Sequence, residues 1–286
     1  MYETLRPELL TASDQEKDLM RRDPTYVVSW AIFSKNPLPY LEMRRPFILG
    51  LHDSSIWKPT IYHFFTSLLE DKNLLIRHYS QNIDGLDFKV AVPSVKLIPV
   101  HGSLSQVSCE GCGAEMDTSV FTKLVKTRIK DIYGQDSDAP SSSSPITCPK
   151  CSKALVKPST VLYGRNLPAS FEANAANDAK KATVVIVAGT SLTVFPAASL
   201  PDLAPTASRV VVNRDYGAGM TGIDFENNER DDIMLEGDCD SVFLDLIEEL
   251  GWLDDLAAHR DGMCENSRAL LDGRLKAVAR SKTNGG

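Results

Sequence analysis

Four of the six cysteines occur as two Cys-x2-Cys pairs, Cys109 with Cys112 and Cys148 with Cys151. The pairs are separated by 35 residues, whereas roughly 15–20 residues is usual between two zinc knuckles. A Ser-rich run at 136–145 accounts for the excess length. Four thiolates can hold one tetrahedral Zn²⁺ and leave no open coordination position. The spacing therefore predicts one structural zinc ion, with a redox pair or unconnected reduced cysteines as the weaker alternatives.

A run of polar residues follows an apolar segment upstream of the first cysteine pair. Gln81, Asn82 and Asp84 come after Leu74-Leu75-Ile76. Sheets of α/β proteins bind ligands at the carboxyl ends of their strands, which is where these side chains are expected to lie. Taken alone, the run is equally compatible with a polar loop that caps a strand.

A histidine occupies the equivalent position after the next apolar segment. His101 follows residues 97–100, and Gly102 permits a sharp turn directly beside it. The pKa of histidine lies near neutrality, so its side chain can accept a proton during a reaction. A single histidine is more often structural than catalytic, and the residue pattern alone leaves both roles open.

Three more short polar segments follow later apolar runs of the chain. Backbone N–H groups and hydroxyls at such strand ends can hold phosphate or ribose oxygens, and a glycine allows close approach. Plain strand-to-helix turns and a helix N-terminus are the alternative explanations. The segments are Gly189-Thr190-Ser191, Asn213-Arg214-Asp215 and Gly237-Asp238-Cys239-Asp240.

The order of expected elements indicates an α/β fold. Continuous apolar runs such as 183–187 suit strands that are covered on both faces. Alternation of strands with helices predicts a doubly wound, mainly parallel, Rossmann-like sheet. Residues 1–60 read as helical, and a further helix runs to about residue 71. Strands are expected at 75–80, 97–101, 158–163, 183–188, 209–213 and 232–235, and helices at about 168–181, 196–204 and 239–250.

Composition limits the class of protein. The chain is 43% apolar and 24% charged, as expected for a globular protein. A net charge of -7 argues against a direct sequence-specific nucleic-acid reader, because such proteins usually carry a basic stripe. There is no basic-then-apolar signal pattern and no apolar run of the roughly 20 residues that a bilayer requires. We therefore expect an intracellular protein of the nucleus or cytoplasm that does not bind membranes.

Taken in order, these motifs resemble those of the sirtuins, which are NAD-dependent protein-lysine deacylases. The resemblance covers about residues 2–252, which would form one catalytic domain. The zinc module at about 102–157 and the helical segment at about 1–72 would be insertions in its Rossmann-like part. Residues 253–286 would form a tail with a loose helix at about 268–279 and a disordered end. The motifs are QNIDGL at 81–86, HGS at 101–103, the cysteine pairs, GTSL at 189–192, NRD at 213–215 and GDCD at 237–240.

The resemblance implies a role for each motif residue. His101 would be the general base, and Asn82 would share the catalytic site. The segment of Gln81, Asn82, Ile83 and Asp84 would hold the nicotinamide and its ribose, with Asp84 at the carboxamide. Phosphate and ribose contacts would come from Gly189, Thr190 and Ser191, the adenine ribose would contact Asn213, Arg214 and Asp215, and Cys239 would abut the adenine mainly through its backbone.

The implied reaction transfers an acyl group from lysine to ADP-ribose. The acyl oxygen attacks the ribose carbon that bears nicotinamide, and nicotinamide leaves. His101 then activates the neighbouring hydroxyls, and the products are free lysine, nicotinamide and O-acyl-ADP-ribose. Acyl-lysine proteins, histones among them, would be the substrates. Their peptide would add a strand between residues 192–195 and the segment Val161, Leu162, Tyr163 and Gly164.

Two departures from the sirtuin pattern stand out. Sirtuins commonly have Glu after this Gly164, whereas this chain has Arg165. Sirtuins also begin with a strand, a GAGxS turn and a GIPDFR-like segment, and residues 2–5 align just downstream of them. Because the first strand of a doubly wound sheet is central, its absence should expose two strand edges. We therefore expect either a truncated or a degenerate member.

Two other functions are compatible with the motifs. Mono-ADP-ribosyl transfer would result if another nucleophile intercepted the same intermediate. A non-catalytic, zinc-stabilised module would bind partner peptides and would not bind NAD.

Overall fold

A computed structural model describes residues 5–51, 57–215, 223, 225 and 231–284. Most of the aligned stretch at residues 2–5 therefore lies outside the described residues. The chain divides into two compact units. The first comprises Met1–Trp57, Asn82–Gly85 and His101–Pro168, and the second comprises Lys58–Gln81, Leu86–Val100 and Ala169–Gly286.

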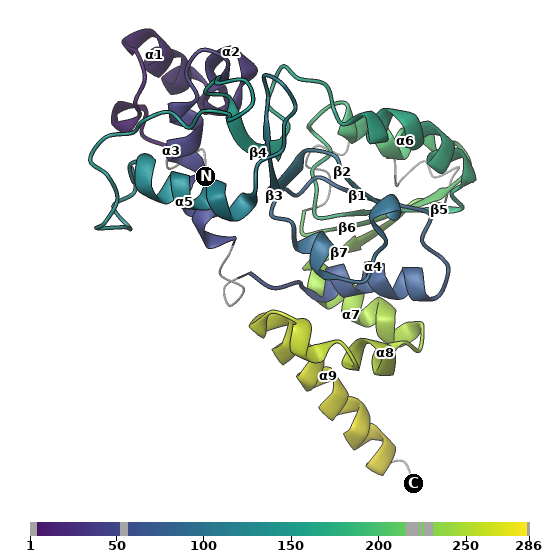
Figure 1. The fold of residues 1–286 in the computed structure, drawn as a ribbon. Coiled ribbons are helices and arrows are strands. Elements are labelled where there is room, and N and C mark those ends of the chain that lie inside the picture. The colour runs from purple at the N-terminus through teal and green to yellow at the C-terminus, as the bar shows by residue number, and fades with distance from the viewer. Residues whose placement is uncertain (1–4, 52–56, 216–222, 224, 226–230, 285–286) are drawn as a thin grey trace. The chain divides into compact units, whose positions relative to one another are not determined.

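Helices surround the core of the first unit (Figure 1). Helix α1 begins with a capping box, because Ser13 and Glu16 each bond the other's backbone N–H. Most of α3 is buried, including charged residues such as Glu42. The helices are α1 (Asp14–Arg22), α2 (Trp30–Phe33), α3 (Leu38–Gly50) and α5 (Thr118–Arg128), with short 3₁₀ turns at Pro7–Leu9 and Pro24–Val28.

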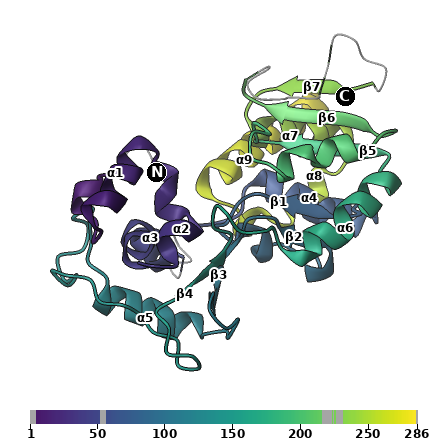
Figure 2. The ribbon, with the colours of Figure 1, turned by 90° about the horizontal axis from the view of Figure 1, so that it is seen from above.

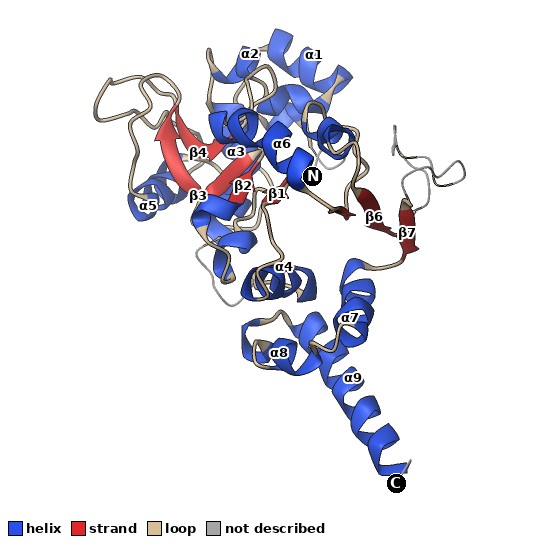
Figure 3. Cartoon of the chain, turned by 90° about the vertical axis from the view of Figure 1, so that its right-hand side faces the viewer, coloured by secondary structure: helices blue, strands red, loops and turns tan. Residues whose placement is uncertain are grey.

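The first unit also contains an antiparallel strand pair, β3 (Gly102–Cys109) and β4 (Val156–Thr160) (Figure 3). The prediction for 158–163 was wrong in pairing, since it assigned this strand to the parallel sheet. Strand β3 was not predicted, because its polar, serine-rich sequence shows little apolar alternation. The register shifts between Gly102 and Val107, so the ladder is irregular beside His101.

A parallel three-stranded sheet lies in the second unit, in the order β5-β6-β7 (Figure 2). The strands are β5 (Val184–Ala188), β6 (Ser208–Asn213) and β7 (Ile233–Glu236). Helix α6 (Ala169–Lys181) precedes β5, and a 3₁₀ helix at Ala197–Leu203 connects β5 to β6. The predicted parallel pairing is confirmed for these three strands.

A second parallel pair in the same unit joins β1 (His78–Ser80) to β2 (Leu97–Pro99). Within the described residues, β1 and β5 form no ladder with each other, so the parallel strands form two separate sheets. Val184 and Ile186 of β5 remain 51% and 37% exposed. Interior strands of parallel sheets are normally covered on both faces, so β5 has the exposure of an edge strand.

Four helices complete the second unit: α4 (Ile61–Asp71), α7 (Cys239–Glu249), α8 (Leu253–Ala257) and α9 (Glu265–Asn284). Their core contains Phe65 and Phe243, whose ring centroids are 4.8 Å apart. Helix α9 is longer than the one expected at 268–279, and Leu271 within it is fully buried. None of the helices in the described ranges is both long enough and apolar enough to span a bilayer.

Candidate zinc and nucleoside sites

The four predicted zinc ligands converge in the first unit. The Sγ atoms of Cys109 and Cys151 are 3.6 Å apart, and those of Cys112 and Cys148 are 3.7 Å apart. All four sulfur atoms lie within 4.8 Å of one another. Zn–S bonds of about 2.3 Å in a tetrahedron place sulfurs about 3.8 Å apart. The spacing therefore fits a four-thiolate zinc ion.

Two tight turns bring these cysteines together. Cys109 ends β3, and its carbonyl accepts a hydrogen bond from the N–H of Gly113 at 2.8 Å. In the second turn the carbonyl of Cys148 accepts from Ser152 N–H at 2.8 Å, with Ser152 in the left-handed region. Pairing of Cys109 with Val156 in the β3–β4 ladder then holds the two turns next to each other.

Gly102 fixes the backbone beside His101. Its φ is +75°, and a Cβ added there would lie 2.0 Å from the carbonyl oxygen of Ser159. Only glycine allows β3 and β4 to approach this closely. The carbonyl of His101 accepts a hydrogen bond from Val161 N–H at 2.8 Å. The half-buried His101 is therefore held at the start of the strand pair.

The loop with Asn82, Ile83 and Asp84 is anchored within the first unit. The carbonyl of Ile83 accepts a hydrogen bond from Leu104 N–H at 2.8 Å, three residues beyond His101. The structure thus brings the Asn82–Asp84 segment next to the strand that His101 precedes. Asn82 itself is exposed, whereas Ile83 and Asp84 are half-buried.

The second unit contains a buried polar cluster that was not predicted from the sequence. The hydroxyl of Ser80 donates to Asp87 at 2.6 Å and so joins the residues that flank the loop. The other Asp87 oxygen lies 3.8 Å from His63 Nε2 and 3.7 Å from His78 Nδ1. Burial lowers the pKa of His78. Nothing in the sequence distinguished His63, His78 and Asp87 from ordinary core polar residues.

The second unit contains an open cleft of about 920 Å³ at the carboxyl ends of β5, β6 and β7. Gly189 lies at the end of β5 with φ +63°, and a Cβ there would lie 3.5 Å from Cys239 Sγ. Gly189, Asn213, Arg214 and Cys239, which come from three of the predicted cofactor motifs, all line the cleft. Its residues are Thr60, Gly189, Asn213, Arg214, Asp238, Cys239, Asp240, Ser241, Cys264, Asn266, Ala269 and Leu270.

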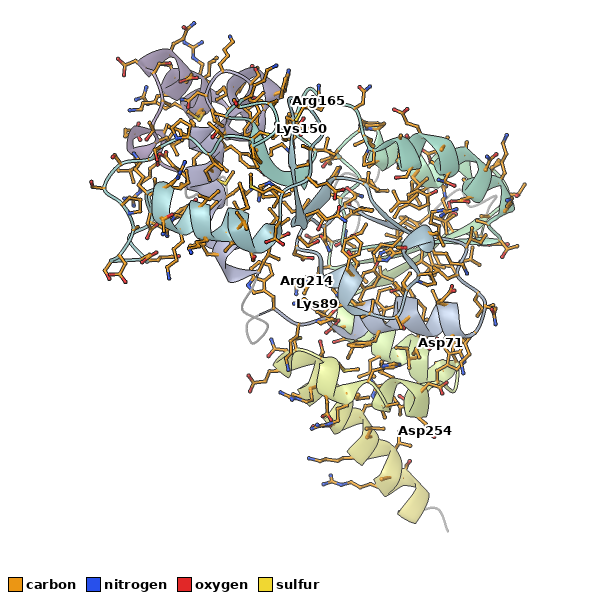
Figure 4. All side chains as sticks on the ribbon, viewed as in Figure 1. Asp71, Lys89, Lys150, Arg165, Arg214 and Asp254 are labelled. Carbon is orange, nitrogen blue, oxygen red and sulfur yellow. The ribbon has the colours of Figure 1, made fainter. Side chains whose placement is uncertain are left out.

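Side chains that line the cleft form hydrogen bonds and an ion pair with neighbouring residues. Arg214, whose side chain is labelled in Figure 4, forms an ion pair with Asp238. Asp238 also caps the first turn of α7 by accepting from Asp240 N–H at 3.2 Å. Asn213 donates to the carbonyl of Thr190 at 3.1 Å. These contacts fix the strand ends that form the cleft.

The remaining predicted cofactor residues lie outside the cleft lining. Gln81 Nε2 donates to the hydroxyl of Thr190 at 3.2 Å, which connects the ends of β1 and β5. Ser191 and Asp215 are exposed. Within the described part of the second unit, the structure therefore groups Gln81 with Thr190 and leaves Ser191 and Asp215 at the surface.

The predicted peptide-binding segment is partly occupied by the chain's own backbone. Tyr163 N–H donates to Val28 C=O at 3.0 Å, and Tyr163 C=O accepts from Trp30 N–H at 2.9 Å. Leu162 is buried, whereas Gly164 is exposed and Val161 is half-buried. Any peptide that pairs here must therefore use backbone groups other than those of Tyr163.

Arg165, the departure from the sirtuin pattern, is held by two partners. Its guanidinium lies 3.3 Å from Glu110 and 4.7 Å from the ring centroid of Trp30. Glu110 also pairs with Lys157, which is 1% exposed, at 2.9 Å. Figure 4 labels Arg165 and Lys150 on the part of the first unit that carries the cysteines. The reversed charge is therefore partly neutralised within the chain.

Together, the parallel strands, the cleft at their carboxyl ends and the four-cysteine cluster define an α/β protein with an open cleft and a centre suited to zinc. A model of the Sir2 family matches residues 11–196, so the chain belongs to the Sir2 family.

Named relatives agree with this assignment. The chain is 35% identical to NAD-dependent deacetylase sir2A of Dictyostelium discoideum over 240 residues, covering 82% of this chain and 43% of the relative. It is 35% identical to NAD-dependent protein deacetylase hst2 of Schizosaccharomyces pombe, covering 80% of this chain and 61% of the relative. The chain thus spans 43% and 61% of their lengths.

A solved structure described as "The Structural basis for Sirtuin Substrate affinity" is similar in fold. The TM-score is 0.61 at 24% identity, and the match covers 79% of this chain and 85% of the other. At this identity the likeness supports the fold alone.

Proposed function

We propose that the chain forms the core of an NAD-dependent protein-lysine deacylase. Membership of the Sir2 family and the named deacetylase relatives support this activity. The observation that carries it is the cleft at the ends of β5, β6 and β7. The cleft gathers predicted NAD residues from three separate motifs, represented by Gly189, Asn213 and Cys239.

The residues that line the cleft would hold the adenosine end of NAD. Gly189 offers a surface without a side chain, and a Cβ there would fill space against Cys239. Asn213 and Arg214 lie at the adjoining strand end, where a ribose can bind. When bound, NAD supplies an electrophilic ribose carbon with nicotinamide as the leaving group.

His101 would act as the general base. Neutral imidazole can accept a proton from a ribose hydroxyl. The close approach of β3 to β4 at Gly102 orients the His101 backbone, and the Ile83–Leu104 hydrogen bond holds the predicted nicotinamide-binding loop near the same strand. Asn82 and Asp84 would bind the nicotinamide ribose and the carboxamide.

Zinc would have a structural role. Cys109, Cys112, Cys148 and Cys151 would satisfy the tetrahedral coordination of zinc and leave no position for substrate. A bound ion would lock the turns that end β3 and precede β4. The same two strands carry Gly102 and the segment that leads to Val161.

The substrate would be an acyl-lysine segment of a protein. Backbone pairing with residues 161–164 would tolerate many sequences. Since Tyr163 already bonds Val28 and Trp30, the exposed Gly164 is the better anchor. Arg165 would favour an acidic side chain near the lysine, weakened by the partial neutralisation from Glu110. We expect histones to be among the proteins to test.

An additional strand would complete the parallel sheet for catalysis, since β1 and β5 form no ladder with each other within the described residues. Val184 and Ile186 are exposed on β5, although the sequence of the strand suits a covered interior position.

The test is a deacylation assay on two proteins: the chain alone, and the chain extended ahead of Met1 by the family's GAGxS and GIPDFR segment. With an acetyl-lysine peptide and NAD, the extended protein should release nicotinamide and deacetylated peptide in equal amounts. His101→Ala should abolish both while zinc content stays unchanged. Equal activity of the extended protein with and without His101 would overturn the assignment of the base.

Failure of the extended protein to release nicotinamide would favour the alternative binding module. That alternative predicts binding of acyl-lysine peptide without NAD. Modification of the peptide with ADP-ribose, in place of loss of its acetyl group, would instead indicate mono-ADP-ribosyl transfer.

A further inference from the structure

The cleft has a wall that none of the recognised motifs supplies. Cys264, directly before α9, and Asn266, Ala269 and Leu270 in its first two turns form this wall, which we call the α9 wall. Helix α9 lies outside residues 11–196 that match the Sir2 family model. The remaining lining residues come from the strand ends, from α7 and from Thr60. A ligand in the cleft therefore meets this wall as well as the predicted NAD motifs.

The α9 wall is firmly held. Cys264 N–H donates to the carbonyl of Pro59 at 2.9 Å. The hydroxyl of Ser267, which is fully buried, donates to Asp240 in the first turn of α7. Met263 and Leu271 on either side are also fully buried. Because this segment is already ordered, ligand binding does not have to pay the conformational entropy of fixing it.

The charges of the cleft favour a nucleoside over a phosphate. Among the described lining residues Arg214 carries the only formal positive charge, and its partner Asp238 neutralises it. Asp240 adds a further carboxylate to the lining. Phosphate groups bind where N–H groups and cations converge, whereas carboxylates and amides suit the hydroxyls of a sugar and the edge of a base.

The α9 wall offers the groups that adenine requires. Asn266 is exposed and carries an amide, whose donor and acceptor match the N7 acceptor and N6 amino group of adenine. Leu270 is 40% exposed although it is apolar, and Ala269 is exposed beside it. The flat face of a base would cover both side chains.

On this basis we propose that the first two turns of α9 recognise the adenine of NAD, with Asn266 reading the edge of the base and Ala269 and Leu270 packing against its face. The inference rests on the proposed NAD site and makes α9 a specificity element of that site.

ADP-ribose and its hypoxanthine analogue, in which an oxygen replaces the amino group, test this inference. Titrations followed by saturation-transfer NMR on the full chain measure weak dissociation constants and show which ligand protons touch the protein. Asn266→Ala should raise the dissociation constant of ADP-ribose about tenfold. The variant should also no longer bind ADP-ribose more tightly than the analogue. Leu270→Ser should weaken the binding of both ligands and reduce the saturation transferred to the protons of the base. Glu265→Gln, on the same turn but outside the lining, should change neither constant.

The outcomes separate the inference from the proposed function. If wild-type protein binds ADP-ribose and both α9 variants bind it equally well, the α9 inference is wrong and the NAD site stands. If wild-type protein binds neither ligand, the NAD site and the α9 inference fail together. Unchanged zinc content and circular dichroism in each variant exclude loss of fold as the cause.

Discussion

Replacing Gly102 by Ala tests how the protein positions its proposed general base. The new Cβ would lie 2.0 Å from the carbonyl oxygen of Ser159 and 2.8 Å from Thr160 Cα, both of them backbone atoms of the paired strand. The left-handed conformation at φ +75° costs a non-glycine residue about 1 kcal/mol. Displacing a packed backbone costs about 2–3 kcal/mol more. We expect a total loss of about 3–4 kcal/mol in the free energy of unfolding.

Gly134→Ala is the matched control for this change. Gly134 belongs to the same unit and has φ +69°, but an added Cβ meets no atom within 4 Å. It should therefore lose only the conformational contribution of about 1 kcal/mol. Urea unfolding followed by circular dichroism, with zinc in excess, measures both losses. Equal losses of unfolding free energy in the two variants would refute the claim that the close contact between β3 and β4 requires glycine at position 102.

Three further predictions concern the metal, a buried ion pair and pH. Cys148→Ser should remove about one zinc per chain and unfold the β3–β4 pair, whereas Cys264→Ser should retain zinc in the same metal analysis. Asp232→Asn should cost about 3 kcal/mol in urea unfolding, because it leaves the buried Arg209 without its main carboxylate; a loss below about 1 kcal/mol would contradict this. Burial lowers the pKa of His78, so the unfolded chain binds more protons below about pH 6.5 and stability should fall as pH drops through that range. His78→Gln should flatten this dependence, and an unchanged slope would show that His78 is not the titrating group.

The convergence of the four cysteines was the most predictable feature of the sequence. Cys-x2-Cys pairs are local motifs whose chemistry hardly depends on the rest of the fold, and the four sulfurs do converge. The parallel strands β5, β6 and β7 were also predicted, because their continuous Val and Ile runs are typical of covered strands.

Features that depend on distant contacts escaped prediction. Strand β3 pairs with β4 across a gap of about 50 residues, and its serines gave no strand pattern. Asp87 belongs to no motif of the sequence, although one of its oxygens lies within 4 Å of both His63 and His78. The α9 wall was missed because the sirtuin resemblance ends near residue 252 and gives no reason to bring Asn266 back to the strand ends.

NAD binding tests the central claim most directly. We would titrate NAD and ADP-ribose into the 286-residue chain and into the form extended by the family's glycine-rich segment. Our account predicts that the chain alone binds both ligands weakly and alike, since its cleft fits the adenosine that they share. The extended form should bind NAD more tightly. Absence of NAD binding by both forms would contradict the account and identify the chain as a zinc-stabilised binding module.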